Sequence, residues 1–461
     1  MKKSLWSFLV SLIFVSISNA SQKEPLKPRV IILTDVSTWE TDDSQSLVRL
    51  FAYADMFEIE GLIYTTGWSL DTTRKDFFAL IHTAIDAYER DLPNLCKRSG
   101  QTGFSQDGHW QRIGYWPSAD YLRSRTVFGS KYRGARYIGS RNDSDGSKLI
   151  IDQANEKDDR PVWVLGWGGA NTLAQAVWQI QNNKNDLKDF LDKIRFYAIT
   201  DQDRDQNTPY ENSSHQWLRR DFADDLFFIW DESAWSYQNR TGKNKWPEYE
   251  DHSQKHGKVG KVYPKYKYGV EGDTPSFLYL LPNGLNAPEK PGLGGWGGYF
   301  AMNVTPDGVT RAYTNHNKIP AKKVSAKYER YFYPAIFNDF AARMNWAKEG
   351  RGNRNPVVKI KQQKNCNPVV LNPRQGKSIH IDATKSIDPD NDELSYHWWV
   401  LSEAGSYKGD ISLLNPQSKI VTVNIPPDSA GTDFHLICEV IDNGTPSLTS
   451  YRRVIIKPKR K

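Results

Sequence analysis

The sequence RVIILTDVSTWETDDSQSLVRLFAYADM, residues 29–56, decides the fold of this chain. Its first part, residues 30–33, is an unbroken apolar run, which is typical of a strand buried on both faces of a parallel sheet. From Ser44 onward apolar residues recur at helical spacing, which predicts a helix that begins just after Asp42 and Asp43. The stretch therefore predicts a strand, an acidic loop and a helix, as in an open α/β sheet.

Three carboxylates, Asp35, Asp42 and Asp43, follow this predicted strand. Open α/β sheets bind their ligands beyond the carboxyl ends of the strands, which is where these residues lie. One or two acids before a helix are explained by capping and by the helix dipole. Three carboxylates around one turn repel one another unless a cation or a proton intervenes, and calcium takes several oxygen ligands. The loop therefore favours a metal site over a simple helix cap.

Further strands are predicted at residues 59–64, 161–165, 194–200 and 227–230. A glycine-rich turn, GWGGAN at residues 166–171, follows the third strand of the chain, and Asp201 and Asp203 follow the fourth. The later segment EGDTPS, residues 271–276, adds Glu271 and Asp273. We expect these loops to lie at the ligand-binding edge of the same sheet. Residues 93–146 show little periodicity and predict long loops with a short helix, and the polar residues 238–268 predict a surface excursion.

The pattern resembles the nucleoside hydrolases, whose first strand runs into an Asp-Thr-Asp-Pro-Gly-x-Asp-Asp loop that holds calcium and the sugar. Asp35 matches the second Asp of that motif, and Asp42 and Asp43 match its closing pair. The chain departs from the motif at Leu33, which replaces the first Asp, and in the longer loop of residues 36–41. A closer resemblance is to secreted bacterial proteins, often labelled cellulose-binding, that join a nucleoside-hydrolase-like domain to a small β domain.

The resemblance implies a fold and a site. The fold is a nucleoside-hydrolase-like parallel sheet with helices on both faces, over residues 21–350. Calcium would be held by Asp35, Asp43, Asp273 and the Ala170 carbonyl, with Asp42 facing the sugar. Asp35 would also take the proton of a calcium-bound water that attacks an anomeric carbon.

Candidate substrate-binding residues follow from the same loops. They are Trp39, Asn171, Asp201, Asp203 and Glu271, the last as a replacement for the missing first acid. A plain glycine-rich turn at residues 166–171 and an exposed acidic loop at residues 201–205 are the alternatives.

Tryptophan is abundant, with sixteen residues in the chain. Seven lie in predicted loops near the acidic motif or its sequels: Trp39, Trp68, Trp110, Trp116, Trp167, Trp217 and Trp296. Core packing explains any one of them. Their number in loops favours flat apolar faces that stack on sugar rings, with Trp39 as the platform inside the acidic loop and the glycine-rich run around Trp296 lining the cleft.

The first twenty residues predict a cleaved secretory signal, with Lys2 and Lys3, an apolar stretch and a small-residue cleavage site at Ala20. No later segment predicts membrane insertion, so the mature protein is expected to be periplasmic or secreted. The net charge of +7 is small for 461 residues and does not indicate nucleic-acid binding.

The end of the chain changes character after a polar linker at residues 348–356. Residues 356–461 alternate in short strands separated by turns, which predicts an immunoglobulin-like β-sandwich that folds apart from the first domain. The Asp-rich turn at residues 388–392 resembles those of immunoglobulin-like modules in secreted carbohydrate-active proteins, and is either a calcium site or a hydrated turn. Whether Cys366 and Cys438 form a disulfide is left open.

Two functions of different class are consistent with these features. One is a calcium-dependent glycosidase that acts on a glycan or glycoside outside the cytoplasm, which the three retained carboxylates favour. The other is a polysaccharide-binding protein on a hydrolase scaffold, which the longer loop favours. Nucleoside hydrolysis ranks third, because the family's sugar-holding Asn and Glu pattern is not recovered. The sequence leaves an oligomer open.

Overall fold

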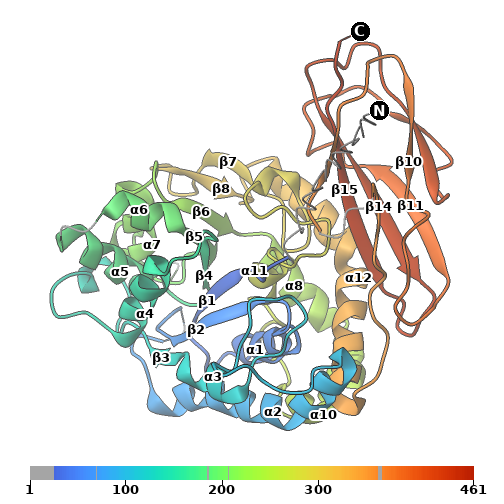
Figure 1. The fold of residues 1–461 in the computed structure, drawn as a ribbon. Coiled ribbons are helices and arrows are strands. Elements are labelled where there is room, and N and C mark those ends of the chain that lie inside the picture. The colour runs from blue at the N-terminus through green and yellow to red at the C-terminus, as the bar shows by residue number, and fades with distance from the viewer. Residues whose placement is uncertain (1–24, 69, 184–185, 206, 362–365, 461) are drawn as a thin grey trace, which may run out of the picture.

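The structure is a computed structural model that describes residues 25–68, 70–183, 186–205, 207–361 and 366–460 (Figure 1). The predicted signal, residues 1–20, lies outside the described residues. The first domain contains an eight-stranded sheet in the order β3-β2-β1-β4-β5-β6-β8-β7. Its strands are β1 Arg29–Thr34, β2 Glu58–Tyr64, β3 Thr126–Phe128, β4 Val162–Gly166, β5 Ile194–Ile199, β6 Phe227–Asp231, β7 Ala301–Val304 and β8 Arg311–Thr314. Neighbouring strands are parallel except β7 and β8, which confirms the predicted α/β sheet.

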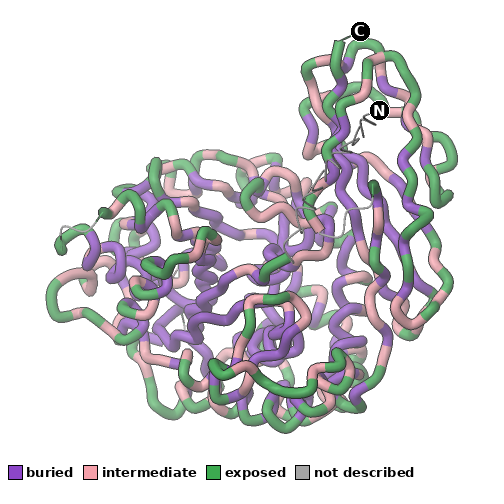
Figure 2. The backbone as a smooth tube through the Cα atoms, in the orientation of Figure 1, coloured by how far each residue is buried: buried purple, intermediate pink, exposed green. Residues whose placement is uncertain are grey.

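Both faces of the sheet are covered by helices, which explains the unbroken apolar run in β1. Val30 and Ile32 belong to one core, and Ile31 and Leu33 to the other. The first core includes α1 Asp42–Ala52, α2 Lys75–Ser99, α10 Gly257–Lys261, α11 Thr274–Leu278 and α12 Ala321–Glu349. The second includes α4 Asp145–Asn155, α5 Asn171–Asn182, α6 Leu187–Lys193 and α7 Ser214–Asp221. Figure 2 shows the strands as the most continuously buried part of the molecule.

Two segments are more ordered than their sequence patterns predict. Within residues 93–146, predicted as loops with a short helix, the structure has the last turns of α2, then α3 Ala119–Ser124, β3 and the short helix η1 Ala135–Tyr137. Residues 238–268, predicted as a surface excursion, form most of α8 Ala234–Asn244, then α9 Trp246–Tyr249, η3 Glu250–Gln254 and α10. That second prediction is wrong because Trp246, Tyr249 and Tyr263 enter the main core, and their polar neighbours hide this from a periodicity analysis. The remaining short helices are η2 Tyr210–Asn212 and η4 Pro291–Leu293.

The C-terminal domain is a sandwich of two sheets, as predicted. One sheet has the order β10-β13-β12 and the other β11-β14-β15-β9. The strands are β9 Val369–Leu371, β10 Ser378–Asp382, β11 Leu394–Val400, β12 Ser412–Leu414, β13 Ile420–Asn424, β14 Phe434–Asp442 and β15 Thr449–Ile456. Cys366 and Cys438 are free thiols, so the structure contains no disulfide between them.

The two domains share a core. Leu401, Ile437 and Tyr451 of the sandwich belong to the same apolar cluster as the helices of the first domain. Figure 1 shows the sandwich standing against the long helix α12. Trp399 packs on Tyr328 of α12 with ring centroids 6.1 Å apart. The prediction of a sandwich that folds apart from the first domain does not account for this interface. Among the described helices none is long and apolar enough to span a membrane.

Candidate active site

The candidate site is a group of carboxylates at the carboxyl edge of the sheet. Asp42, Asp43 and Asp273 each offer an oxygen, and these oxygens all lie within 4.8 Å of one another. Asp42 and Asp43 lie in the first turn of α1, two residues earlier than the predicted helix start. Asp273 stands at the N-cap position of α11, where its side chain makes no capping hydrogen bond. The Thr34 hydroxyl at the end of β1 donates a hydrogen bond to Asp43. Two helix starts and one strand end therefore converge on a buried acidic group.

Asp35 lies beside this group, held between the loops that follow β2 and β4. A Cβ on Gly67 would stand 2.0 Å from Asp35 Oδ2, and a Cβ on Gly168 would stand 3.1 Å from Asp35 Oδ1. A side chain at Gly67 would collide with the carboxylate and one at Gly168 would crowd it, so both glycines let the backbone approach Asp35 closely. The glycine-rich turn after β4 is thus part of the site and not only a connection.

A fifth carboxylate, Glu40, interacts electrostatically with these four acids. Burial and the neighbouring charges raise the pKa of Asp35, Asp43 and Asp273 well above the usual carboxyl value. Burial raises the pKa of Asp42 to about 6, and burial together with Asp42 raises the pKa of Glu40 to about 7. Glu40 was not among the predicted site residues, although its place in the acidic loop was a signal. Five acids that all resist ionisation indicate a site built for a counter-charge.

The donor set fits calcium. Asp273 is 3% exposed, and its Oδ2 atom has no hydrogen-bond partner among the described residues. Carboxylate oxygens are the ligands that calcium prefers, and a buried unpartnered one is costly without a cation. The group of three contains Asp42, which was predicted to face the sugar, while Asp35 lies at its side. The Ala170 carbonyl accepts the first helical hydrogen bond of α5, from Ala174, and its place as a ligand stays a prediction.

Two predicted substrate ligands are instead occupied by the protein. The Asn171 amide donates to the Gly134 carbonyl and accepts from the Gly134 N–H, so it holds the loop before η1. Asp203 accepts from the Ala170 N–H, the Ser214 hydroxyl and the His215 N–H. These bonds link the starts of α5 and α7, so both residues position the rim of the site.

Asp201 differs from Asp203. Its Oδ1 accepts from the Ser213 hydroxyl and the Asp203 N–H. Its buried Oδ2 has no hydrogen-bond partner among the described residues and lies 3.7 Å from His215 Nδ1. Burial, followed by the charge of Asp203, raises the pKa of Asp201 to about 7. Of the predicted acidic pair, Asp201 is the one with an oxygen that accepts no hydrogen bond from the described residues.

Glu271 was predicted to replace the missing acid, and the structure gives it another role. Its carboxylate is fully buried, 2.5 Å from the Arg49 guanidinium, and accepts a hydrogen bond of 2.9 Å from the Tyr263 hydroxyl. The carboxylate is thus already neutralised inside the protein. Glu271 therefore holds the loop that carries Asp273 in place and does not face a ligand.

Aromatic side chains border the acidic group. Trp39, Trp68 and Tyr268 are 46%, 41% and 69% exposed. The Lys267 ammonium donates to the Thr38 carbonyl, which places Tyr268 next to the acidic loop, and the Trp68 N–H donates to Gln202. We call Trp39, Trp68 and Tyr268 the aromatic rim.

The prediction of sugar-facing tryptophans is wrong for three residues. Trp116, Trp167 and Trp296 are fully buried in the main core. Trp167 donates to the Ser276 hydroxyl, and Trp296 packs against Tyr451 of the sandwich, so the glycine-rich run lies at the domain interface. Trp217 is half-buried on α7. Loop position alone did not separate core from surface.

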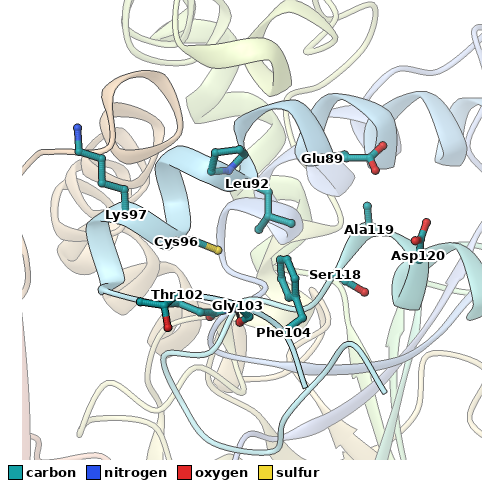
Figure 3. A pocket seen from close by; sticks show the side chains of 12 residues that line it. Glu89, Leu92, Cys96, Lys97, Thr102, Gly103, Phe104, Ser118, Ala119 and Asp120 are labelled. Atoms are coloured by element: carbon teal, nitrogen blue, oxygen red, sulfur yellow. Dashed lines mark hydrogen bonds between the residues drawn. The ribbon is translucent and has the colours of Figure 1, made fainter. Parts of the chain in front are cut away.

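Two cavities differ in how near they lie to the acidic group. A cleft of about 710 Å³ is lined by Tyr132, Arg133 and Tyr137 and reaches Asp203. A separate cavity of about 550 Å³ lies between the end of α2, the loop of residues 101–104 and α3. Figure 3 shows Leu92 and Phe104 extending toward each other there. The first cleft reaches the rim of the site at Asp203, whereas the second lies near the end of α2, where that helix has returned the chain to the amino edge of the sheet.

The comparisons with known proteins match this architecture. Residues 29–300 match the family described as cellulose-binding Sde182, nucleoside hydrolase-like domain, and residues 378–458 match the C-terminal domain of cellulose-binding protein Sde0182. A nucleoside hydrolase-related hypothetical protein from Saccharophagus degradans, associated with carbohydrate metabolism, has 35% identity and a TM-score of 0.81. That match covers 94% of this chain and 100% of the other.

More distant structures add little. The type III effector XopQ complexed with adenosine diphosphate ribose has 10% identity and a TM-score of 0.34, over 70% of this chain and 96% of that chain. None of the curated proteins compared with the chain matches it. The domain matches and the full-length structural match agree with the predicted resemblance. The chain belongs to the Sde182 family, with a nucleoside hydrolase-like domain followed by the family's C-terminal domain.

Proposed function

We propose that this protein is a calcium-dependent glycoside hydrolase that acts on a glycan or glycoside in the periplasm or outside the cell. The observation that carries the proposal is the convergence of Asp42, Asp43 and Asp273, whose ligand oxygens lie within 4.8 Å of one another in a buried setting. A helix cap needs one carboxylate, not three from two separate helices. The name of the Saccharophagus degradans relative, which mentions carbohydrate metabolism, supports the substrate class.

Each acidic residue has a task in this proposal. Asp42, Asp43 and Asp273 would hold the cation, which when bound supplies the positive charge that keeps the carboxylates ionised and acidifies a water. Asp35 lies beside the three and is placed to accept a proton as water attacks an anomeric carbon. Asp201, with its pKa raised to about 7, is a candidate donor to the leaving group.

The surroundings support a sugar as substrate. The aromatic rim offers apolar ring faces, on which sugar rings stack. The Arg74 guanidinium lies over the Trp39 ring, 5.1 Å from its centroid, and this cation–π contact steadies the Trp39 side chain. The cleft next to Asp203 gives room for further units.

A second candidate function is glycan binding without hydrolysis. Exposed Trp39, Trp68 and Tyr268 would serve binding alone, and the family's printed description is cellulose-binding. Nucleoside hydrolysis remains the third candidate, since a nucleobase also stacks on aromatic rings.

Assays of the mature chain against a glycan panel and a set of nucleosides, with calcium and with chelator, test the proposal. We expect calcium-dependent release of reducing ends from a glycan or glycoside, lost in Asp35→Asn and Asp43→Ala. Glycan binding with no hydrolysis, unchanged in Asp35→Asn, would support the binding function instead. Release of nucleobase alone would support the third candidate.

A further inference from the structure

The cleft of about 710 Å³ begins directly beside the acidic group. Two consecutive glycines in the turn after β4 lie between them. A Cβ on Gly168 would stand 3.1 Å from Asp35 Oδ1. A Cβ on the next residue, Gly169, would stand 2.3 Å from Oδ1 of Asp203, which lines the cleft. This turn therefore packs against the acidic group at one residue and against the wall of the cleft at the next.

The Arg133 side chain makes a second connection between the acidic group and the cleft. It lines the cleft and donates to the carbonyls of Gly67 and Trp68, at 3.3 and 3.0 Å. Gly67 lies against the Asp35 carboxylate, and Trp68 belongs to the aromatic rim. The aromatic rim and the cleft are therefore adjacent.

Loops at the carboxyl edge of the sheet form the walls of the cleft. Its lining residues come from 71–72 after β2, from 132–137 after β3 and from 208–212 after β5. The three strands run parallel to β1, so these loops lie at the same edge as the acidic group. The volume lies within the range of about 300–1,000 Å³ that is typical of ligand-binding pockets.

Two tyrosines in the loop after β3 stack on each other. The ring centroids of Tyr132 and Tyr137 are 4.8 Å apart, with an angle of 26° between the planes. The Lys131 ammonium lies over the Tyr132 ring at 5.1 Å, and the Arg136 guanidinium lies over the Tyr137 ring at 4.7 Å. Because neighbours cover the ring faces, the tyrosines offer hydroxyl groups and ring edges to a ligand in the cleft.

The charged side chains that line the cleft have both signs. Arg133 pairs with Asp71 at 2.9 Å, and Arg136 and Glu211 are exposed. Such a wall offers hydrogen-bond donors and acceptors together, and a sugar hydroxyl is both a donor and an acceptor. An anionic ligand would be attracted by the arginines but repelled by the carboxylates. The lining therefore suits a neutral ligand that is rich in hydroxyl groups.

We propose that the cleft, with residues 132–137 as its specificity-determining wall, makes the site select a neutral glycan chain. One unit of the chain lies at the acidic group and further units lie in the cleft. The inference rests on the proposed function, because it takes the acidic group as the place where the glycan is held. It narrows the substrate class to uncharged oligosaccharides and polysaccharides, since a small glycoside or a nucleoside would leave the cleft unoccupied.

Calorimetric titration of the mature Asp35→Asn chain, with calcium present, tests the cleft. The probes are β-1,4-linked glucose oligomers from glucose to cellopentaose, because this linkage gives a flat ribbon whose ring faces match the aromatic rim. Asp35→Asn removes the proposed proton acceptor, so the oligomers stay intact during the titration. We expect the Kd to fall by about tenfold or more as the oligomer lengthens.

Two variants block the cleft from different loops. Ala135→Trp and Asn212→Trp each place a bulky ring in it, and the second provides an independent route if the first folds poorly. Each should remove the gain in affinity with length and leave the shortest oligomer that binds measurably unaffected. Ala223→Trp is the matched control. It adds the same ring at an exposed residue of a separate cavity of about 420 Å³, beside the first residues of β6 and β8, and should keep the gain.

The outcomes separate this inference from the proposed hydrolysis, which is assayed on the wild-type chain. A gain with length that both blocking variants lose supports the cleft even if the wild-type chain releases no reducing ends. The proposal is overturned if affinity does not rise with length, or if the blocking variants keep the gain, and neither result contradicts hydrolysis of a small glycoside. Oligogalacturonates, which carry a carboxylate on each ring, should show no gain, and an equal gain would overturn the neutral substrate class.

Discussion

The Arg49 guanidinium and the Glu271 carboxylate form a fully buried ion pair at 2.5 Å. Arg49 lies on α1, two turns after Asp42 and Asp43, and Glu271 lies two residues before Asp273. The pair therefore ties the loop that carries one acid of the site to the helix that carries the other two. Glu271 also has a φ of 57°, which is uncommon for glutamate. The ion pair with Arg49 helps to maintain this backbone conformation.

We expect Arg49→Met to destabilise the protein and to weaken calcium binding. Removing one partner of a buried pair leaves an uncompensated charge and costs about 3–5 kcal/mol. The released loop would also let Asp273 move from the acidic group. Urea unfolding and calcium titration measure the two effects. Lys188→Met, which breaks the exposed pair with Asp192, is the control and should change neither. If Arg49→Met is destabilised but binds calcium with normal affinity, the ion pair supports the fold and not the geometry of the calcium site.

The acidic group itself predicts a calcium response. Asp43→Ala should bind calcium far more weakly and lose both the calcium-dependent gain in melting temperature and any hydrolysis. If the acids only support the helix dipole, the loss should be near ~1 kcal/mol with no calcium dependence. Asp145→Ala removes an exposed acid from the first turn of another helix, α4. That control should show the dipole effect alone.

Stability of the calcium-free protein should fall as pH rises. Burial raises the pKa of Asp42 to about 6 and of Glu40 to about 7, from usual values of 3.8 and 4.5. The folded state then binds more protons than the unfolded state between about pH 4 and pH 7, so the free energy of unfolding decreases through that window. Urea titrations from pH 4 to 8, with and without calcium, check the sign. A flat or rising profile without calcium would contradict the raised pKa values.

Much of this architecture could be predicted because one physical pattern dominated. The apolar run of β1 predicted a strand buried on both faces, and the alternate contacts of Val30 and Ile31 with opposite cores confirm it. Asp42 and Asp43 were predicted at the start of the helix that follows β1, and such a helix begins at the carboxyl edge of a parallel sheet. These are local signals, so a single sequence contains them.

Other features depend on tertiary contacts that no local pattern contains. Glu271 and Asp201 are both acids in polar loops. Only the structure shows that Glu271 pairs with Arg49, whereas one oxygen of Asp201 has no hydrogen bond among the described residues. Trp39 and Trp296 likewise both follow glycine or polar residues. The sandwich buries Trp296 through Tyr451, a contact across more than 150 residues of sequence, whereas Trp39 stays exposed.

Trp39 should contribute to substrate binding with little effect on stability. It is 46% exposed and touches Phe77 through an edge contact with centroids 5.2 Å apart. Stacking of aromatic rings contributes about 0.5–1.5 kcal/mol, so Trp39→Ala should weaken glycan affinity by up to about tenfold. Trp110 is 56% exposed next to the segment that precedes β1, at the amino edge of the sheet, and Trp110→Ala is the matched control. Equal losses in both variants, or a large drop in melting temperature for Trp39→Ala alone, would argue against a platform.

The domain interface and the linker sequence lead to opposite predictions about whether the first domain folds without the sandwich. Residues 348–356 are polar, which predicted that a chain ending near Asn355 folds by itself. In the structure, Phe332 of α12 packs against Tyr451 with ring centroids 5.7 Å apart, and the Arg453 guanidinium donates to the Leu285 and Gly294 carbonyls. Removing the sandwich would expose this apolar face and leave both carbonyls without their buried donor.

We therefore expect the truncated chain to melt at a lower temperature than the full chain and to aggregate, because exposed apolar surface promotes association. In the full chain, Tyr451→Ala should cost about 3 kcal/mol or more, since it opens a cavity at the centre of the interface. Tyr407→Ala, on a half-buried residue that packs on Phe434 within the sandwich, should cost less. Calorimetry should show one cooperative transition for the full chain. Two separate transitions, with the first domain melting as in the truncated chain, would show that the domains fold independently despite their contacts.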